Sequence, residues 1–537
     1  MGNVERSDNV LKPDYGQRGS NEFYRFGRAG AGETEEPSAR GDLSRLRQSL
    51  GPEPEVVHMP QPTRRVGWFV TGFIIASVLG IVIGAVAIVA FPSFSGKTKT
   101  AESSTRFDSE KLAEANAPAA AATAPAVAAA PAAPAAARPA NNAPARVANV
   151  GGQSEPAPSV RGVTDSEIRF GISAPFSGPA KELGQNMKLG IETAFAAANA
   201  SGGVNGRQLR LVAVDDGYEP SRTATAMKQL FEKDQVFAVI GNVGTPTAAV
   251  ALPYALDRKM LFFGAFTGAG LLRNDPPDRY VFNYRASYAE ETAAVVNYLV
   301  KVKGLSPDQI AVFAQQDAYG DAGYAGVEKA IRALRGGTES QIVRLNYQRN
   351  TVDVDDAVAQ LAQTQQQRKS LPIKAVIMVP AYRAAAKFIE KTRDLYPDMV
   401  YTSVSFVGAT ALANELMLLG KKYATGVIVT QVVPAVEGHS SLVLDYEAAL
   451  TKFFPGEAHD YVSLEGYVDA SVMIAALQRT GAQVDTEKLV ATLENLRDLD
   501  IGLGTPVAFS RSEHQGVHKV WGTQLDGNGR YQPIDLQ

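Results

Sequence analysis

The sequence of 537 residues contains no cysteine, only five histidines and only two tryptophans. The lack of cysteine excludes disulfides, thiolate metal ligands and cysteine nucleophiles. An excess of charge of one sign is also missing, because 53 Lys and Arg stand against 56 Asp and Glu, for a formal net charge of -3. Without a basic surplus or a long run of like charges, we expect no nucleic acid partner. These absences leave the cellular compartment open.

Complete catalytic signatures are missing as well. No G-x-S-x-G nucleophile elbow occurs, and the Gly-rich run at residues 264–270 lacks dinucleotide-binding spacing. Gly96, Lys97 and Thr98 match the last three residues of a phosphate-binding loop motif, but Phe91 occupies the position at which that motif requires its first glycine. His514 and His518 have helical metal-ligand spacing, yet no third ligand is evident, so we expect a surface hairpin there. We therefore expect no enzyme, no metal site and no cofactor.

The first 162 residues lack the pattern of a globular domain. Residues 1–65 are rich in Gly, Pro, Ser and charged residues, which predicts a disordered tail. Residues 66–96 carry no charge, and the 25 apolar positions of 66–90 would reach roughly 38 Å as a helix, enough to cross a hydrocarbon core of about 30 Å. We predict a transmembrane helix over 66–91. Residues 92–162 are dominated by Ala and Pro, which predicts a disordered, semi-rigid linker.

A cleavable signal peptide is the alternative for the apolar segment. Ala85, Val86 and Ala87 form an A-x-A cleavage pattern, and Arg64 and Arg65 precede the apolar run. The apolar region and a leader of 65 residues are both too long for this alternative, which favours an uncleaved anchor. Two Arg residues precede the apolar run and two Lys residues follow it. The positive charge is therefore equal on both sides, and the positive-inside rule does not decide the orientation.

From residue 164 onward, short Val/Ile/Phe runs alternate with amphipathic stretches. We predict strands at 167–173, 208–215, 236–240, 260–264, 310–314, 375–379, 400–404 and 426–431. We predict helices at 184–200, 222–233 and 288–302, and another from residue 321. This alternation indicates an α/β fold with two parallel sheets. Parallel sheets bind ligands at the carboxyl ends of their strands, so two facing sheets would form a cleft.

Polar, glycine-containing loops follow three of these predicted strands. Ser177, Thr245 and Thr267 lie in them, and two of the loops open a helix whose N-terminal amides favour an anion. A single hydroxyl of this kind is explained equally well as a helix cap. Three such loops on neighbouring strands predict a ligand pocket.

An ordered set of motifs extends over residues 165–537. The set is Pro-Phe-Ser-Gly at 175–178, Asn-Ala-Ser-Gly-Gly-Val-Asn-Gly-Arg at 199–207, Asp-Asp at 215–216, Pro220, Val-Ile-Gly at 239–241 and Asp-Ala-Tyr-Gly at 317–320. It resembles the type I periplasmic solute-binding proteins of the leucine/isoleucine/valine-binding group. The resemblance implies a solute-binding domain at 163–537, a clamshell of two lobes joined by three crossovers. Lobe 1 would comprise about 163–284 and 432–503, and lobe 2 about 285–431 and 504–537.

The resemblance also implies roles for individual residues. The loop of Thr245 and the loop of Ala265, Phe266 and Thr267 would hold a ligand's carboxylate and amino group. Two tyrosines from the opposite lobe, Tyr319 and Tyr382, would cover the ligand, although a Tyr at a strand end is as often ordinary packing.

One departure from the family concerns the ligand's ammonium group. Members that bind branched-chain amino acids have a glutamate in the segment that matches residues 405–408, where this chain offers Ser405, a candidate ligand contact, and Phe406. A buried ammonium needs an anionic partner. Either Asp317 or Glu182 supplies the charge, or the ligand is not an α-amino acid.

The function implied is capture of a small amino acid or carboxylate, for an ABC-type import permease. The protein would be anchored by one helix in the inner (cytoplasmic) membrane, with its C-terminal domain in the periplasm or outside. Because a diffusing binding protein needs neither anchor nor tail, a ligand-sensing receptor that signals to a partner is the alternative. Hydrolysis of a small amide or ester is less favoured, since a nucleophile and a base are missing.

Overall fold

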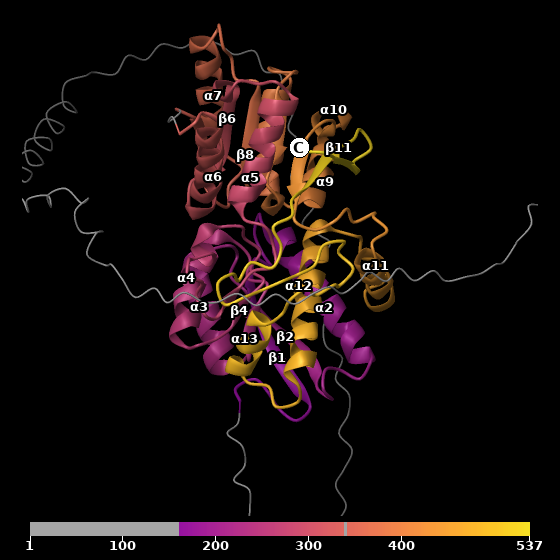
Figure 1. Cartoon of the computed structure of the whole chain (residues 1–537). Helices are drawn as coiled ribbons and strands as arrows, with labels where there is room; N and C mark the ends of the chain where they lie inside the picture. The colour runs from indigo at the N-terminus through magenta and orange to yellow at the C-terminus, as the bar shows by residue number, and fades with distance from the viewer. Residues whose placement is uncertain (1–159, 338–340) are drawn as a thin grey trace, which may run out of the picture. The chain divides into compact units, whose positions relative to one another are not determined.

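The computed structural model describes residues 160–337 and 341–537 (Figure 1). The predicted tail, the predicted transmembrane helix and the linker up to residue 159 lie outside these ranges. Among the residues described, no helix combines the length and the apolar character that crossing a membrane requires.

The first sheet contains five parallel strands in the order β2-β1-β3-β4-β5. Their bounds are β1 Glu167–Ala174, β2 Gln208–Asp215, β3 Ala238–Ile240, β4 Phe262–Phe263 and β5 Val281–Phe282. β1 and β2 pair along their whole length, from Glu167 opposite Gln208 to Ala174 opposite Asp215. The loops that follow β1, β2, β3 and β4 therefore leave the sheet at one edge.

Six helices accompany this sheet, three of them from a distant part of the sequence. They are α2 (Lys181–Ala200), α3 (Pro220–Lys228), α4 (Thr245–Asp257), α11 (Ser441–Phe453), α12 (Tyr461–Thr480) and α13 (Thr486–Glu494). Helix α12 lies against α2 (Figure 1). A Cβ on Gly190 of α2 would lie 1.8 Å from the Ser463 carbonyl oxygen, so only glycine permits this approach.

The second sheet contains seven strands in the order β12-β11-β10-β9-β8-β6-β7. Their bounds are β6 Ile310–Gln315, β7 Val343–Tyr347, β8 Ala375–Val379, β9 Val400–Ser403, β10 Ile428–Gln431, β11 Trp521–Leu525 and β12 Tyr531–Ile534. β6 to β10 are parallel, while β11 and β12 are antiparallel additions. Every residue of β8 is buried, as expected for a parallel strand covered on both faces.

The helices that accompany the second sheet come from the part of the sequence between β5 and α11. They are α5 (Tyr288–Asn297), α6 (Ala318–Leu334), α7 (Asp355–Gln367), α8 (Tyr382–Arg393), α9 (Ala409–Leu419) and α10 (Lys421–Ala424). Short π-helical turns continue α3 (Gln229–Lys233) and α5 (Tyr298–Val302), and 3-10 turns occur at Gly270–Leu272, Pro307–Gln309 and Ser405–Val407. The prediction of an α/β fold with two sheets is confirmed.

We refer to the first sheet with its helices as lobe 1 and to the second as lobe 2. The chain passes between the lobes three times, from β5 to α5, from β10 to α11 and from α13 to β11. In the third passage the His514 carbonyl accepts from the Asn283 amide at 2.8 Å, next to β5. The prediction that His514 lies in a surface hairpin is wrong, because its buried ring stacks on Phe282 with centroids 3.8 Å apart.

Candidate ligand-binding site

Two threonine hydroxyls meet at the edge of the first sheet. Thr245 begins α4 after β3, and Thr267 lies in the loop after β4. The two Oγ1 atoms are 2.7 Å apart, and both residues are fully buried. The loops are held together because the Phe266 amide donates to the Asn242 carbonyl at 2.8 Å. The structure thus brings together two of the three hydroxyls that the strand-end loops predicted.

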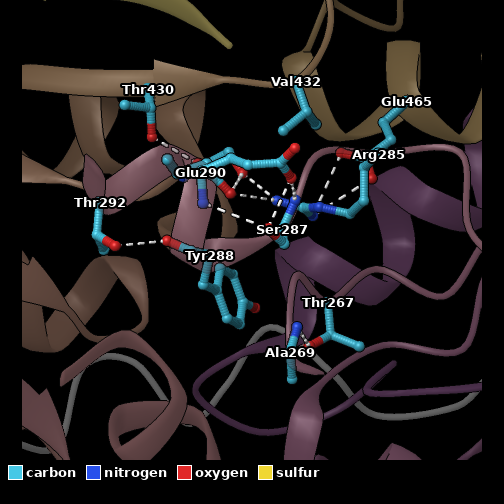
Figure 2. Close-up of polar contacts among 12 residues, drawn as sticks. Thr267, Ala269, Arg285, Ser287, Tyr288, Glu290, Thr292, Thr430, Val432 and Glu465 are labelled. Atoms are coloured by element: carbon cyan, nitrogen blue, oxygen red, sulfur yellow. Dashed lines mark hydrogen bonds and ion pairs between the residues drawn. The ribbon is translucent and has the colours of Figure 1, made fainter. Parts of the chain in front are cut away.

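A third hydroxyl, which the sequence did not indicate, comes from lobe 2. Tyr288 begins α5, its amide donates to the Gly268 carbonyl at 2.8 Å, and its ring points toward Thr267 (Figure 2). The Tyr288 hydroxyl is buried and has no well-formed hydrogen bond. Burial raises the pKa of Tyr288 to about 12, so the group is a neutral donor at physiological pH.

Aromatic rings from both lobes pack beside these hydroxyls. Phe406, from the segment after β9, lies 5.1 Å from Phe266 of lobe 1 and 4.5 Å from Tyr319 of lobe 2, measured between ring centroids. Tyr218 of lobe 1 lies 6.0 Å from Phe406, and Tyr319 lies 5.4 Å from Tyr288. We call these five residues the aromatic cluster; each is at most 1 % exposed.

The remaining predicted residues have other surroundings. Ala265 is buried in the core of lobe 1. Ser177 is exposed, and its hydroxyl donates to Asp215 Oδ2 at 2.6 Å, which ties the loop after β1 to the end of β2. Tyr382 has a buried hydroxyl without a partner and lines a cavity of about 340 Å³ between α2, α8 and α9. Glu182, one proposed partner of an ammonium group, lines this same cavity.

Ser405 belongs to a buried group of polar and charged residues that joins the lobes and includes Arg285 and Glu465, which Figure 2 labels. Arg285, in the first passage between lobes, lies 3.0 Å from Glu291 of α5 and 3.3 Å from Glu465 of α12. The Ser405 amide donates to Glu291 Oε2 at 2.8 Å, and the Thr430 hydroxyl donates to the same carboxylate at 2.5 Å. We call these five residues the ionic cluster.

Burial and pairing act in opposite directions on the charges of the ionic cluster. Burial alone would lower the pKa of Arg285, but Glu465 and Glu291 keep it above its ordinary value. Burial raises the pKa of Glu465 to about 7, against the opposing effect of Arg285. Arg285 also lies over the Phe266 ring, with its Cζ 5.0 Å from the centroid, so its positive charge borders the aromatic cluster.

A second set of contacts closes the lobes on one another. Arg349, after β7, pairs with Glu219 of lobe 1 at 2.8 Å and with Asp317 of lobe 2 at 3.1 Å. Asn350 donates to the Gly217 carbonyl at 3.0 Å. We call the contacts of Arg349 and Asn350 with the loop after β2 the interlobe latch. Asp317, the other proposed partner of an ammonium group, is thus already paired.

A cavity of about 710 Å³ lies where the lobes and two of the passages meet. Tyr288 and Glu290 from the start of α5, Lys329 of α6, and Arg273 and His518 contribute to its lining. Glu290 accepts from His518 Nδ1 at 2.6 Å, which links the start of α5 to the third passage.

Comparisons with known proteins agree with this architecture. The family model described as periplasmic binding protein matches residues 167–530. The chain is 24 % identical over 345 residues to Leu/Ile/Val-binding protein homolog 3 of Brucella melitensis biotype 1, covering 63 % of this chain and 86 % of that protein.

Two solved structures show the same arrangement of elements. A possible leucine/isoleucine/valine-binding protein from Rhodopirellula baltica SH 1 is 41 % identical with a TM-score of 0.65, covering 71 % of this chain and 99 % of that one. A branched chain amino acid ABC transporter from Thermus thermophilus with bound valine has a TM-score of 0.60 at 17 % identity, covering 69 % and 96 % of the two chains. At such low identity the second likeness concerns the fold alone.

Proposed function

The chain belongs to the type I periplasmic binding protein family, in the leucine/isoleucine/valine-binding group, and on this premise we propose that it captures a small amino acid or carboxylate between its lobes. Lobe 1 would comprise about 163–284 and 432–503, and lobe 2 about 285–431 and 504–537. The captured solute would be passed to an ABC-type import permease. Proteins of this family bind solutes and are not enzymes.

One observation carries this proposal: the hydroxyls of Thr245 and Thr267 are in contact beside the aromatic cluster, whose Tyr288 ring points toward Thr267 (Figure 2). Hydroxyl donors at the start of α4 suit a carboxylate, because a helix N-terminus carries a partial positive charge. The rings of Phe266, Tyr319 and Phe406 suit the apolar body of a small molecule.

Capture requires the lobes to separate and close. Thr245, Thr267 and Tyr319 are fully buried in the closed arrangement, so a solute reaches them only when the lobes move apart. The three passages between lobes are the segments in which such a hinge motion would take place. Closure then removes the solute from water and completes its contacts from both sides.

We also propose that residues 66–91 anchor the protein in the inner membrane by a single uncleaved helix, with the solute-binding domain in the periplasm or outside. The absence of charge over residues 66–96 supports this. The full chain should remain with membranes after alkaline extraction, and Leu79→Arg with Ile83→Arg should release it. A mature chain that begins just after Ala87 would instead indicate a signal peptide.

Thermal-shift screening of the full-length chain against amino acids, carboxylates and amides tests the capture proposal. A solute present at a hundredfold excess over its Kd should stabilise the protein by about 2.7 kcal/mol. If no compound of these classes raises the unfolding temperature, capture is rejected. Conversion of a stabilising compound into a product would identify an enzyme.

A further inference from the structure

The hydroxyl side of the site is arranged to meet an anion. Thr245 and Thr267 contact each other at 2.7 Å at the start of the 13-residue helix α4. Tyr288 adds a buried hydroxyl that makes no well-formed hydrogen bond within the described chain, and its ring points toward Thr267 (Figure 2). A buried polar group without a partner is costly, so a ligand oxygen that accepts from Tyr288 would relieve that cost.

The carboxylates that lobe 2 places near the aromatic cluster are already paired. Asp317 lies 3.1 Å from Arg349, accepts from Gln315 at 2.7 Å and accepts from the Tyr319 amide at 3.0 Å. Glu291 is held by Arg285 and by the Ser405 amide within the ionic cluster. Neither group is free to neutralise a second cation.

Two buried carboxylates of lobe 1 are also unsuited to a ligand's ammonium group, one because it is paired and the other because it is tightly packed. Asp216 accepts from the Ser173 hydroxyl at 2.7 Å and from the Tyr218 amide at 2.9 Å. Asp469 lacks a partner, but its carboxyl group is packed against Gly264, where a Cβ would lie 2.4 Å from its Cγ. Burial raises the pKa of Asp469 well above its ordinary value, which favours its neutral form.

Cations already border the faces of the aromatic rings. Arg285 lies 5.0 Å from the Phe266 centroid and 5.8 Å from that of Tyr288, and Arg349 lies 6.0 Å from that of Tyr218. Each of these guanidinium groups is itself paired with carboxylates, and it occupies a position at the rings that a ligand's ammonium group would otherwise take. The aromatic cluster therefore does not replace the missing carboxylate as a site for an ammonium group.

On the basis of the proposed capture function, we propose that the ligand is a carboxylate without an ammonium group, whose apolar or aromatic body packs on Phe266, Tyr319 and Phe406. Its oxygens would accept from the hydroxyls of Thr245, Thr267 and Tyr288. Arylalkanoates and branched alkanoates have this chemistry. An α-amino acid would bury an ammonium group without an anionic partner.

Matched pairs of compounds test this directly. Calorimetric titration of the full-length chain in mild detergent at pH 7 would compare 3-phenylpropionate with L-phenylalanine, and 4-methylpentanoate with L-leucine. The acid that lacks the amino group should bind about tenfold tighter or more, because the carboxylates described beside the aromatic cluster are paired or, for Asp469, packed against Gly264. The neutral 3-phenylpropanamide should bind more weakly than 3-phenylpropionate.

Two outcomes would overturn the ligand class. One is an amino acid that binds as tightly as its matched acid, which would leave solute capture intact. The other is no binding of either acid while the wider screen finds a ligand that is not a carboxylate or that carries an ammonium group. A screen in which nothing binds rejects capture itself, so the two failures can be told apart.

A negative charge introduced into the aromatic cluster provides a second test of the ligand class. Phe406→Glu should shift the affinity ratio toward L-phenylalanine by about tenfold or more, because it supplies the missing anion. Phe406→Gln, which has the same shape without charge, should not shift the ratio. A folded Phe406→Glu protein with an unchanged ratio would argue against the assignment, and if this variant does not fold, the wild-type pairs decide.

Discussion

Thr245 and Thr267 are 22 residues apart in the sequence, yet their hydroxyls touch because β3 and β4 are neighbouring strands. Their position at strand ends could be predicted from the sequence alone. The contribution of Tyr288 could not, because it comes from the other lobe, at the first turn of a helix. Ser177 followed the same strand-end pattern, but its hydroxyl binds Asp215 instead of facing the other two.

Removing either threonine hydroxyl should weaken an anionic ligand. We expect Thr245→Val or Thr267→Val to reduce its binding free energy by about 1.5 to 3 kcal/mol, since a hydrogen bond to a charged group is lost. The measurement is calorimetric titration with the best ligand of the screen. Thr225→Val, on the exposed face of α3, is the matched control and should leave affinity unchanged. If the two site variants behave like this control, the hydroxyls only support the loops.

His518 should make stability depend on pH. Its hydrogen bond to Glu290 raises the pKa of His518 above its unfolded value of about 6.5. The stabilisation is therefore fully present below that pH and is lost as the pH rises through the folded pKa. The unfolding temperature of the wild type should fall more between pH 6 and pH 8.5 than that of His518→Gln.

A matched substitution separates this pair from a general effect of pH. His439→Gln changes an exposed histidine in the second passage between lobes. This control should follow the wild-type profile. A wild-type profile parallel to that of His518→Gln would mean that the contact with Glu290 does not contribute.

At the scale of elements, a strand or helix can be predicted when it is long enough to show a regular pattern of apolar and polar residues. β2 and β8 begin and end where their apolar runs predict, and α2 begins three residues earlier than predicted. β4 lies within the strand predicted at 260–264 but has only two residues, and β5, which also has two residues, is too short for a periodic pattern and was not predicted. Helix α12 is buried on nearly all sides, so it lacks the polar face by which amphipathic helices are recognised.

The close contact of α2 with α12 leads to a prediction about Gly190. A Cβ there would lie 1.8 Å from the Ser463 carbonyl oxygen, so Gly190→Ala should force the helices apart. We expect a loss of about 1 to 3 kcal/mol or more in unfolding free energy, measured with denaturant. Gly270→Ala is the control, because no atom lies within 4 Å of its new Cβ. Equal stability of both variants would contradict a tight helix contact.

At the scale of the whole molecule, the lobes are joined through residues that are far apart in the sequence. Arg285 and Glu465 are separated by 180 positions, and Arg285 and Ser405 by 120. No local pattern relates such residues, which is why the ionic cluster was not predicted. Ser405 was expected to contact a ligand through the family resemblance, but its polar atoms contact Glu291 and Arg285.

Removing the central cation should destabilise both lobes together. Arg285→Met leaves Glu291 buried without its cation, and we expect a loss of about 3 to 5 kcal/mol in unfolding free energy. Denaturant unfolding followed by circular dichroism is the measurement. Arg344→Met removes a partly exposed pair with Asp321 and should cost at most about 1 kcal/mol. A loss as small as this for Arg285→Met would mean that the ionic cluster adds little to stability.

The interlobe latch has a consequence for how often solute is exchanged with the surroundings. Only molecules whose lobes have parted can take up or release a solute, and Arg349 and Asn350 oppose that parting. A firmer latch lowers the fraction of empty molecules that are open and also slows the opening of filled ones, so it slows uptake and lengthens the residence of a molecule already inside. The strength of the ion pair between Arg349 and Glu219 would thus set how fast bound solute exchanges with free solute, without any contact between this pair and the solute.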